Sequence, residues 1–464
     1  MKQTHKSLVG LLGLAVVGGG LAGAAVWSTR HDAAKKKADE KAAQLFTFKA
    51  DQVTALTVQA KGDTTVLTKD KSGWRITQPI SAPADASAVE GLLANLSSLR
   101  SARTLDGAGG DLAKYGLAKP ATAVTATYPG GTASVSLGDT NDFSGGQYAV
   151  VGGKASPLLL EGTHPVLAKS SFELRDKRLL IFDGAEVAKL QIDASPDAYT
   201  LERDGARWKV TAPREEKADD AAVSRILGAL SNLKATAVAS EAATDLKPFG
   251  LEVPQATVTL TLKSGKQVVL KLGQGSDKKM FAQASTQPLV AEVPSSAAAP
   301  LHVSLDALQD KTIARVARDQ VAAVQLTTPK GDKLLIQRKT TSSDAGASVQ
   351  TWVQLSPKSG AVPRWKASSL LYTFANLRGT QVVGQAPADL AKFGLDKPTR
   401  EVTLQDTTGK ALADVIFGKV DGANTYAKAK DDPRIFELLA SRLSDLPNAP
   451  DDLLEKKTAT AAKR

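Results

Sequence analysis

After its first fifty residues the chain opens with short runs in which apolar and polar positions alternate. Val53–Gln59 is followed by two more β-rich runs, Thr64–Thr68 and Trp74–Thr77, with turn residues between them. A period of two places alternate side chains on opposite faces of a sheet, and Gly-containing breaks of this length suit hairpin turns. The pattern therefore predicts a three-stranded antiparallel meander.

A helical pattern comes next. Asp85 is a candidate N-cap, and the apolar residues after it recur at the three- and four-residue spacing of one helix face. They are Val89, Leu92, Leu93, Leu96 and Leu99. We expect this helix to pack on the sheet; a groove for a partner is the alternative interpretation of the same stripe.

Four more strands and a second helix complete the predicted unit. The strand-like runs are Ala123–Tyr128, Thr132–Leu137, Gln147–Val151 and Leu158–Glu161, and they predict a second small sheet. A helix containing Leu174 follows. The unit thus belongs to the α+β class, with mainly antiparallel strands and two packed helices.

This pattern occurs three times. The clearest markers are the tryptophans Trp74, Trp208 and Trp352, the first two 134 residues apart and the last two 144 apart. The third unit therefore carries a ten-residue insertion, which we place at Thr341–Gln350 and expect to lengthen a hairpin loop. Repetition over this length indicates tandem domains. We predict repeat units at residues 45–178, 179–311 and 312–447, called repeats 1, 2 and 3 below.

A glycine-centred motif marks each repeat as well. It reads Leu-Ala-Lys-Tyr-Gly-Leu-Ala-Lys-Pro at residues 112–120. Its recurring glycines are Gly116, Gly250 and Gly394, and its recurring prolines are Pro120, Pro254 and Pro398. A left-handed glycine followed by an apolar residue that packs backward is the Schellman helix stop, and the proline keeps the helix from resuming. We interpret these residues and the three tryptophans as structural markers.

The two ends of the chain differ from the repeats. Ser7–Thr29 holds no charged residue and is long enough to cross a bilayer as a helix, so we predict an N-terminal transmembrane anchor within residues 1–29. Cleavage after Ala22-Gly23-Ala24, as in an export signal, is the alternative. Residues 30–44 predict a charged helical stalk and residues 448–464 a disordered tail. The bulk of the chain would then be periplasmic or extracytoplasmic, held at a bacterial inner membrane.

Composition adds little chemistry. The formal charge is +11 but is spread along the repeats, without the basic stripe and stacking aromatics of a nucleic-acid surface. The chain has no cysteine, and its four histidines lack partners at metal-ligand spacing. No motif for a nucleophile, a metalloprotease or a phosphate loop is present. We therefore predict no catalytic residue, no cofactor and no metal.

Several motifs together resemble a known family. These are the opening F…DxVxxLxV, the run Gly73–Asp85 of the form GWxIxxPxxxPAD, and the YGLxxP motif at Tyr115–Pro120. On these residues the sequence resembles the bacterial family called "domain of unknown function 4340". The third repeat departs from it at Trp352–Pro363, where Pro-Ala-Asp is missing. The resemblance implies a membrane-anchored envelope protein, often found alongside membrane subunits of ABC-type transport systems like those of gliding motility. It implies no catalytic residues.

Two functions of different class follow as expectations. The first is a non-catalytic accessory or binding subunit of an ABC-type transport complex, with membrane subunits as partners. The alternative is an envelope scaffold that binds cell-wall glycan or other envelope proteins. Aromatics such as Tyr148, Trp365 and Tyr426 are candidate contacts for it if exposed, but half-buried packing is the interpretation we favour for them. An enzyme is the least favoured class. The sequence leaves the ligand, the oligomeric state and the relative orientation of the repeats open.

Overall fold

The computed structural model describes residues 43–105, 111–152, 154, 156–342 and 348–455. No helix in these ranges is long and apolar enough to cross a membrane. The predicted anchor at Ser7–Thr29, and the stalk up to residue 42, lie outside the described residues.

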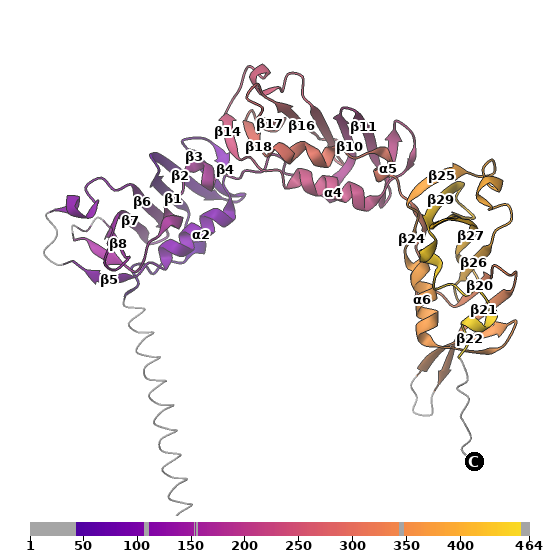
Figure 1. Cartoon of the computed structure of the whole chain (residues 1–464). Helices are drawn as coiled ribbons and strands as arrows, with labels where there is room; N and C mark the ends of the chain where they lie inside the picture. The colour runs from indigo at the N-terminus through magenta and orange to yellow at the C-terminus, as the bar shows by residue number, and fades with distance from the viewer. Residues whose placement is uncertain (1–42, 106–110, 153, 155, 343–347, 456–464) are drawn as a thin grey trace, which may run out of the picture. The chain divides into compact units, whose positions relative to one another are not determined.

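Each repeat contributes one nine-stranded sheet, and the three sheets share one strand order (Figure 1). The first sheet runs β4-β3-β2-β1-β6-β7-β8-β9-β5. Its strands are β1 Ala55–Ala60, β2 Asp63–Asp70, β3 Gly73–Gln78, β4 Ala82–Pro83, β5 Ser101–Thr104, β6 Thr122–Tyr128, β7 Gly131–Thr140, β8 Gln147–Val151 and β9 Leu158–Leu160. Its helices are α2 Ala86–Ser97 and α3 Ser171–Leu174.

The second sheet has the order β13-β12-β11-β10-β15-β16-β17-β18-β14. Its strands are β10 Val187–Ala194, β11 Asp197–Asp204, β12 Arg207–Ala212, β13 Glu216–Lys217, β14 Ala237–Ser240, β15 Ala256–Leu262, β16 Gln267–Gln274, β17 Met280–Ala284 and β18 Val290–Val293. The helices of this repeat are α4 Asp220–Ser231 and α5 Leu305–Leu308.

The third sheet repeats the pattern as β23-β22-β21-β20-β26-β27-β28-β29-β25. Its strands are β20 Ala323–Thr327, β21 Lys333–Ser342, β22 Ser348–Ser356, β23 Gly360–Val362, β25 Gln381–Gln385, β26 Arg400–Gln405, β27 Ala411–Asp421, β28 Asn424–Ala429 and β29 Arg434–Leu439. The repeat also holds α6 Arg364–Ala375 and a two-stranded pair, β19 Thr312–Ala314 with β24 Leu377–Arg378.

The prediction of a second small sheet is wrong, because each repeat has one continuous sheet. Strand β1 pairs with β2 on one side and with β6 on the other, both antiparallel. Pairing with β6 covers the edge that β1 would otherwise expose in an isolated meander. The mainly antiparallel α+β architecture itself is confirmed, with three matching sheets.

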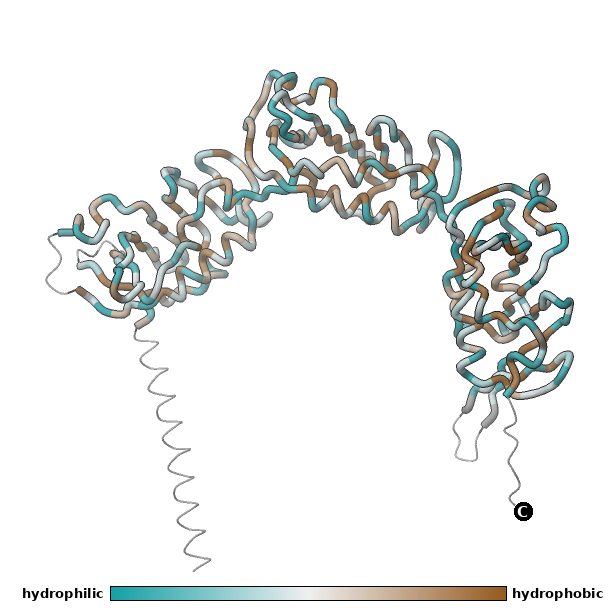
Figure 2. The backbone as a smooth tube through the Cα atoms, in the orientation of Figure 1, coloured by the Kyte–Doolittle hydropathy of each residue, from teal (hydrophilic) through white to brown (hydrophobic). Residues whose placement is uncertain are grey.

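The predicted long helix is confirmed, and its stripe is a packing face. The Asp85 carboxylate accepts a hydrogen bond from the Ala88 N–H at 3.0 Å, which fixes the start of α2. The stripe residues Val89, Leu92, Leu93, Leu96 and Leu99 are at most 1% exposed and share one core with the strands. Figure 2 shows the same hydrophobic interior and hydrophilic loops. The stripe of α2 is therefore filled by the sheet, with no groove left for a partner.

The second helix of each repeat is only one turn long. It is α3 in repeat 1, α5 in repeat 2, and a 3₁₀ turn at Ala440–Leu443 in repeat 3. In α3 the Ser170 hydroxyl and the Glu173 carboxylate form a reciprocal capping box, which stabilises a helix too short to persist alone.

The glycine motif has the predicted Schellman hydrogen bonds, but it ends a 3₁₀ turn instead of an α-helix. In repeat 1 Gly116 has φ of 67°, and the Leu117 N–H donates to the Leu112 carbonyl at 2.9 Å. A Cβ on Gly138 in β7 would lie 2.1 Å from the Tyr115 carbonyl oxygen. The equivalent Cβ positions in the other repeats, at Gly273 and Gly418, would lie 2.2 and 2.1 Å from the carbonyls of Gly250 and Phe393. The motif therefore recurs because its backbone packs directly on a strand.

Two expectations about repeat 3 need correction. The insertion lengthens the β21–β22 ladder itself, with Thr340 paired to Gln350, and does not simply enlarge a loop. The tail expected to be disordered from residue 448 is ordered through 455. Leu453 is 3% exposed within the core of repeat 3, and Lys366 Nζ donates to the carbonyls of Asp452 and Leu454. An apolar residue in a polar segment thus holds the tail to the sheet.

The backbone also divides into two compact units that do not follow the repeat boundaries. Among the described residues, one unit comprises those within 43–181, Ser231–Val253 and Gly273–Ser295, and the other comprises Phe182–Leu230, Pro254–Leu272 and those within 296–455. Repeat 3 lies wholly within the second unit. The boundaries of 45–178, 179–311 and 312–447 stay a prediction.

Candidate functional site

A basic residue on the second strand of each repeat lies opposite the tryptophan on the third strand. The register pairs Lys69 with Trp74 and Arg203 with Trp208. In both repeats the cation covers the indole, with Lys69 Nζ 5.9 Å and Arg203 Cζ 4.3 Å from the ring centroid. These tryptophans are only 6% and 3% exposed. The prediction that they are structural fits this packing.

Repeat 3 keeps the register but not the contact. Arg338 lies opposite Trp352. Trp352 is half-buried, however, and among the described residues no cation lies over its ring. Its indole instead lines a cavity of about 900 Å³. The third tryptophan therefore differs from the other two in what its ring faces.

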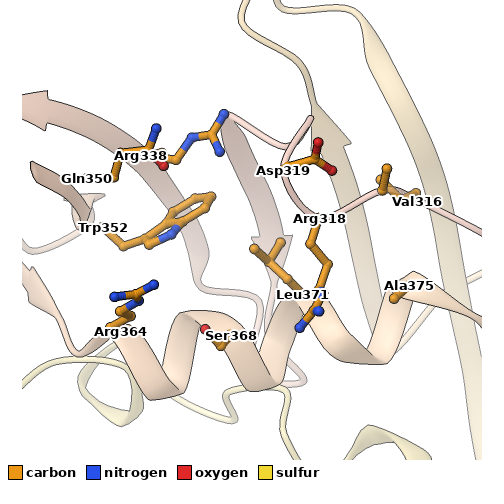
Figure 3. Close-up of a pocket in the computed structure, with 11 residues that line it drawn as sticks. Val316, Arg318, Asp319, Arg338, Gln350, Trp352, Arg364, Ser368, Leu371 and Ala375 are labelled. Carbon is orange, nitrogen blue, oxygen red and sulfur yellow. The ribbon is translucent and has the colours of Figure 1, made fainter. Parts of the chain in front are cut away.

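The cavity is built from three parts of repeat 3 (Figure 3). Strands β21 and β22 provide Arg338, Gln350 and Trp352. The segment between β19 and β20 contributes Val316, Ala317, Arg318 and Asp319, and α6 contributes Arg364, Ser368, Leu371 and Ala375. The α6 residues recur at helical spacing, so one face of the helix forms a wall of the cavity.

The lining is electropositive. It holds three guanidinium groups, on Arg318, Arg338 and Arg364, against one carboxylate, on Asp319, for a net formal charge of +2. Arg318 and Arg364 are exposed and Arg338 is half-buried. None of the three forms an ion pair with a carboxylate that the structure describes. The N–H donors of these three guanidinium groups are therefore not used on any carboxylate that the structure describes.

The corresponding place in repeat 2 carries the opposite charge. Asp220 begins α4, where Arg364 begins α6. The Asp220 carboxylate accepts hydrogen bonds from Arg207 and from the Trp208 N–H, both at 2.9 Å. Repeat 3 has Arg364 at this position, so it lacks the carboxylate that accepts these hydrogen bonds in repeat 2.

The start of α6 has lost a second acid as well. Asp219 lies before α4, and its carboxylate accepts from the Ala222 N–H at 2.9 Å. Pro363 holds that place before α6 and provides no side-chain cap. The first N–H groups of α6 therefore lack the carboxylate that satisfies their counterparts in repeat 2, and the positive end of the helix dipole is not neutralised there.

This arrangement can bind an anion with several oxygen atoms. Guanidinium groups make paired, charge-assisted hydrogen bonds to carboxylate and phosphate, and they remain charged at any physiological pH. The indole beside them offers a flat apolar surface. Among described residues, no group of three or more acidic or histidine side chains could hold a metal ion.

Sequence reasoning missed the site, although one signal for it was readable. It treated Trp352 only as a marker and did not single out Arg318, Arg338 or Arg364. Alignment of the repeats exposes the reversal from Asp220 to Arg364, and a charge reversal in an otherwise repeated framework is a sign of specialisation. Pro120, Pro254 and Pro398 each lie two residues before a strand, and their interpretation as structural markers stays a prediction.

The three aromatics considered as candidate glycan contacts differ in exposure. Tyr426 is only 9% exposed and packs on Phe393, with ring centroids 4.7 Å apart. Tyr148 is half-buried against Tyr115, at 4.8 Å. Trp365, on α6, is 68% exposed. The half-buried packing that we favoured for these side chains is found for Tyr148, whereas Tyr426 is more deeply buried and Trp365 is exposed.

Comparison with known proteins gives one family. The model described as "Domain of unknown function (DUF4340)" matches residues 74–209, 208–362 and 361–463. The first two matches begin at Trp74 and Trp208 and each ends in the following repeat, so the matched segments are offset from the repeat units defined above. No curated protein matches the chain.

Proposed function

The chain belongs to the family described as a domain of unknown function (DUF4340), and we propose that it is a non-catalytic binding protein of the bacterial cell envelope. In this proposal it serves as an accessory or binding subunit of an ABC-type transport complex, and repeat 3 takes up an anionic ligand. Repeats 1 and 2 act as the structural part of the same chain.

One observation carries the proposal. Arg318, Arg338 and Arg364 surround a cavity beside Trp352 and have no described acidic partner, whereas repeat 2 neutralises the same place with Asp220. Keeping like charges together costs free energy unless a ligand neutralises them. A binding role is therefore the simplest reason for the cluster.

Two further features support the location and the partners. Ser7–Thr29 has the length and apolar character of a membrane anchor. The family resemblance suggests ABC-type membrane subunits as neighbours. Both come from the sequence, and both belong to the proposal.

Anion binding is tested by calorimetry on the full chain, with citrate and inorganic phosphate as probes. We expect citrate to bind, and we expect Arg338→Ala combined with Arg364→Ala to weaken it at least about tenfold, as loss of charge-assisted hydrogen bonds implies. Arg442→Ala is the matched control, because Arg442 is exposed in the same repeat and outside the cavity. Binding that the double variant leaves unchanged would refute the site.

The complex is tested separately by crosslinking the tagged chain in intact cells, followed by mass spectrometry. Recovery of ABC-type membrane subunits is the expected result. Recovery of cell-wall material alone would instead favour the scaffold function.

A further inference from the structure

We propose that the ligand of this cavity is an acidic glycan, whose sugar ring lies on Trp352 while its carboxylate or phosphate groups bind the surrounding arginines. This inference rests on the proposed anion-binding function and specifies the ligand class. It joins two observations that concern different parts of the ligand: an indole that no described cation covers, and three guanidinium groups that form no ion pair with a described carboxylate.

The uncovered indole is the first argument. In repeats 1 and 2 the chain provides its own cover, since Lys69 and Arg203 lie over Trp74 and Trp208. In repeat 3 the cover is missing and the ring of Trp352 faces a cavity. A half-buried aromatic ring in a cavity is a good surface for a ligand with a flat apolar face, and the C–H face of a pyranose ring is such a surface.

The polar lining is the second argument. Asp319, Gln350 and Ser368 line the cavity together with the arginines. A carboxylate accepts hydrogen bonds only, an amide both donates and accepts, and a hydroxyl does both. Sugar hydroxyls satisfy all three. A ligand with anionic groups alone would gain nothing from Asp319 and would be repelled by it.

Asp319 also separates a glycan from a nucleic acid. Single-stranded nucleic acid is bound by grooves that are basic throughout and that carry several aromatic side chains for successive bases. This cavity has one indole and one carboxylate among its three cations. Those features suit a ligand with isolated negative charges and many hydroxyl groups.

The size and surroundings of the cavity fit a ligand longer than one ring. About 900 Å³ lies near the upper end of the roughly 300–1,000 Å³ range of small-molecule sites. Trp365 and Tyr372, which are not part of the lining, lie seven residues apart on α6 and are 68% and 67% exposed. Arg318 Cζ lies 5.8 Å from the Tyr372 ring centroid. The same helix that forms a wall of the cavity thus also carries exposed aromatic side chains, one of them beside a lining arginine.

The decisive experiment is calorimetry on the full chain with five probes. Trigalacturonate and glucose 6-phosphate represent carboxylated and phosphorylated sugars. Maltotriose is a neutral glycan, AMP is a nucleotide, and citrate is an anion without a ring. The variants are Trp352→Ala and Asp319→Asn, with Arg442→Ala as the control. Circular dichroism and thermal unfolding verify that each variant is folded.

We expect at least one acidic sugar to bind about tenfold or more tightly than maltotriose, citrate and AMP. Trp352→Ala should remove at least about nine-tenths of that affinity, while citrate binding changes less than threefold. If Trp352→Ala unfolds the repeat, Asp319→Asn provides the second measurement. This variant should bind the acidic sugar more weakly and citrate more tightly.

The possible failures are distinguishable. Citrate binding equal to that of the acidic sugars, with no effect of Trp352→Ala or Asp319→Asn, would overturn the glycan inference and leave the anion site intact. If AMP binds more tightly than the acidic sugars, the ligand class is a nucleotide and the glycan inference fails. If maltotriose binds as tightly as the acidic sugars, charge plays no part in recognition and the inference also fails. Absence of binding to every probe would overturn the glycan inference together with the proposed anion site.

Discussion

The guanidinium carbon of Arg203 lies 4.3 Å from the centroid of the Trp208 ring. The two residues are cross-strand neighbours on β11 and β12, so the contact follows from sheet register. The same register brings Arg338 opposite Trp352, where the contact is absent. The same strand register thus places a guanidinium against an indole in repeat 2, whereas in repeat 3 Arg338 and Trp352 do not make this contact.

This difference predicts that replacing the arginine by alanine lowers the free energy of unfolding more in repeat 2 than in repeat 3. Arg203→Ala should destabilise the chain by about 0.5–1 kcal/mol, because it removes a cation–π contact and uncovers a buried indole. Arg338→Ala should cost less than about 0.5 kcal/mol, since no such contact is lost. Calorimetric unfolding of the two full-length variants would compare them. An equal or larger loss for Arg338→Ala would show that its guanidinium supports the fold.

Gly138→Ala should be among the most damaging small substitutions in repeat 1. The added Cβ, which is fixed rigidly to the backbone, would lie 2.1 Å from the backbone carbonyl oxygen of Tyr115, and neither atom can rotate away. We expect a loss of about 2–3 kcal/mol, within the range for overpacking. Gly91→Ala is the control: it lies on α2 with open space around its Cβ, and it should stabilise the helix by up to about 1 kcal/mol. A mild effect at Gly138 would argue against direct packing of the motif on β7.

Glu173 predicts an acid-sensitive contribution to stability. A hydrogen bond from Lys61 Nζ, 2.8 Å from Glu173 Oε2, and one from the Ser170 N–H lower the pKa of this carboxyl from 4.5 to about 2. Because the folded pKa is the lower one, the contribution is complete above pH 4.5 and is lost as pH falls toward 2. The side chain is 39% exposed, so solvent screening limits the effect to about 0.2–1 kcal/mol.

The measurement is urea unfolding at several values of pH for the original chain and for Glu173→Gln. The difference in unfolding free energy between them should shrink as pH falls from 4.5 to 2. Glu90→Gln is the control, since Glu90 is exposed on α2 and pairs with no described side chain. A difference that stays constant over this range would mean that the Lys61–Glu173 pair contributes nothing.

How far the sequence predicted this fold depended on whether the determinants are local. Strand and helix positions were readable, because Asp85 caps α2 and the stripe from Val89 onward buries one face. The merging of two expected sheets into one was not readable, because it depends on pairing between β1 and β6, which are separated by more than sixty residues. Long-range pairing leaves no periodic trace in either strand.

The candidate site was hidden for a related reason. Arg338 and Trp352 meet through register, and Arg318 and Arg364 reach the same cavity from separate segments. Each arginine is unremarkable as part of a net charge of +11 spread along the chain. Only the comparison of Asp220 with Arg364 carries local information, and its meaning depends on knowing that both residues begin equivalent helices.

That comparison gives the sharpest prediction. Arg364→Asp places in repeat 3 the residue type that repeat 2 carries at Asp220. The formal charge of the cavity falls from +2 to zero, so citrate affinity should drop at least about tenfold. Stability should rise at the same time by about 0.3–1 kcal/mol, because a carboxylate in the first turn of α6 favours the helix dipole and can accept from an N–H that Pro363 leaves uncapped.

Thermal unfolding and citrate calorimetry on one variant therefore measure opposite effects of one side chain. The reciprocal substitution, Asp220→Arg, is the control: it breaks the bond to Arg207 and should lower stability without changing citrate binding. A gain of stability with lost affinity in Arg364→Asp would mean that the arginine is kept for binding at the expense of the fold. A loss of both stability and citrate affinity would mean that Arg364 stabilises the fold. The argument that repeat 3 is specialised for binding would then fail.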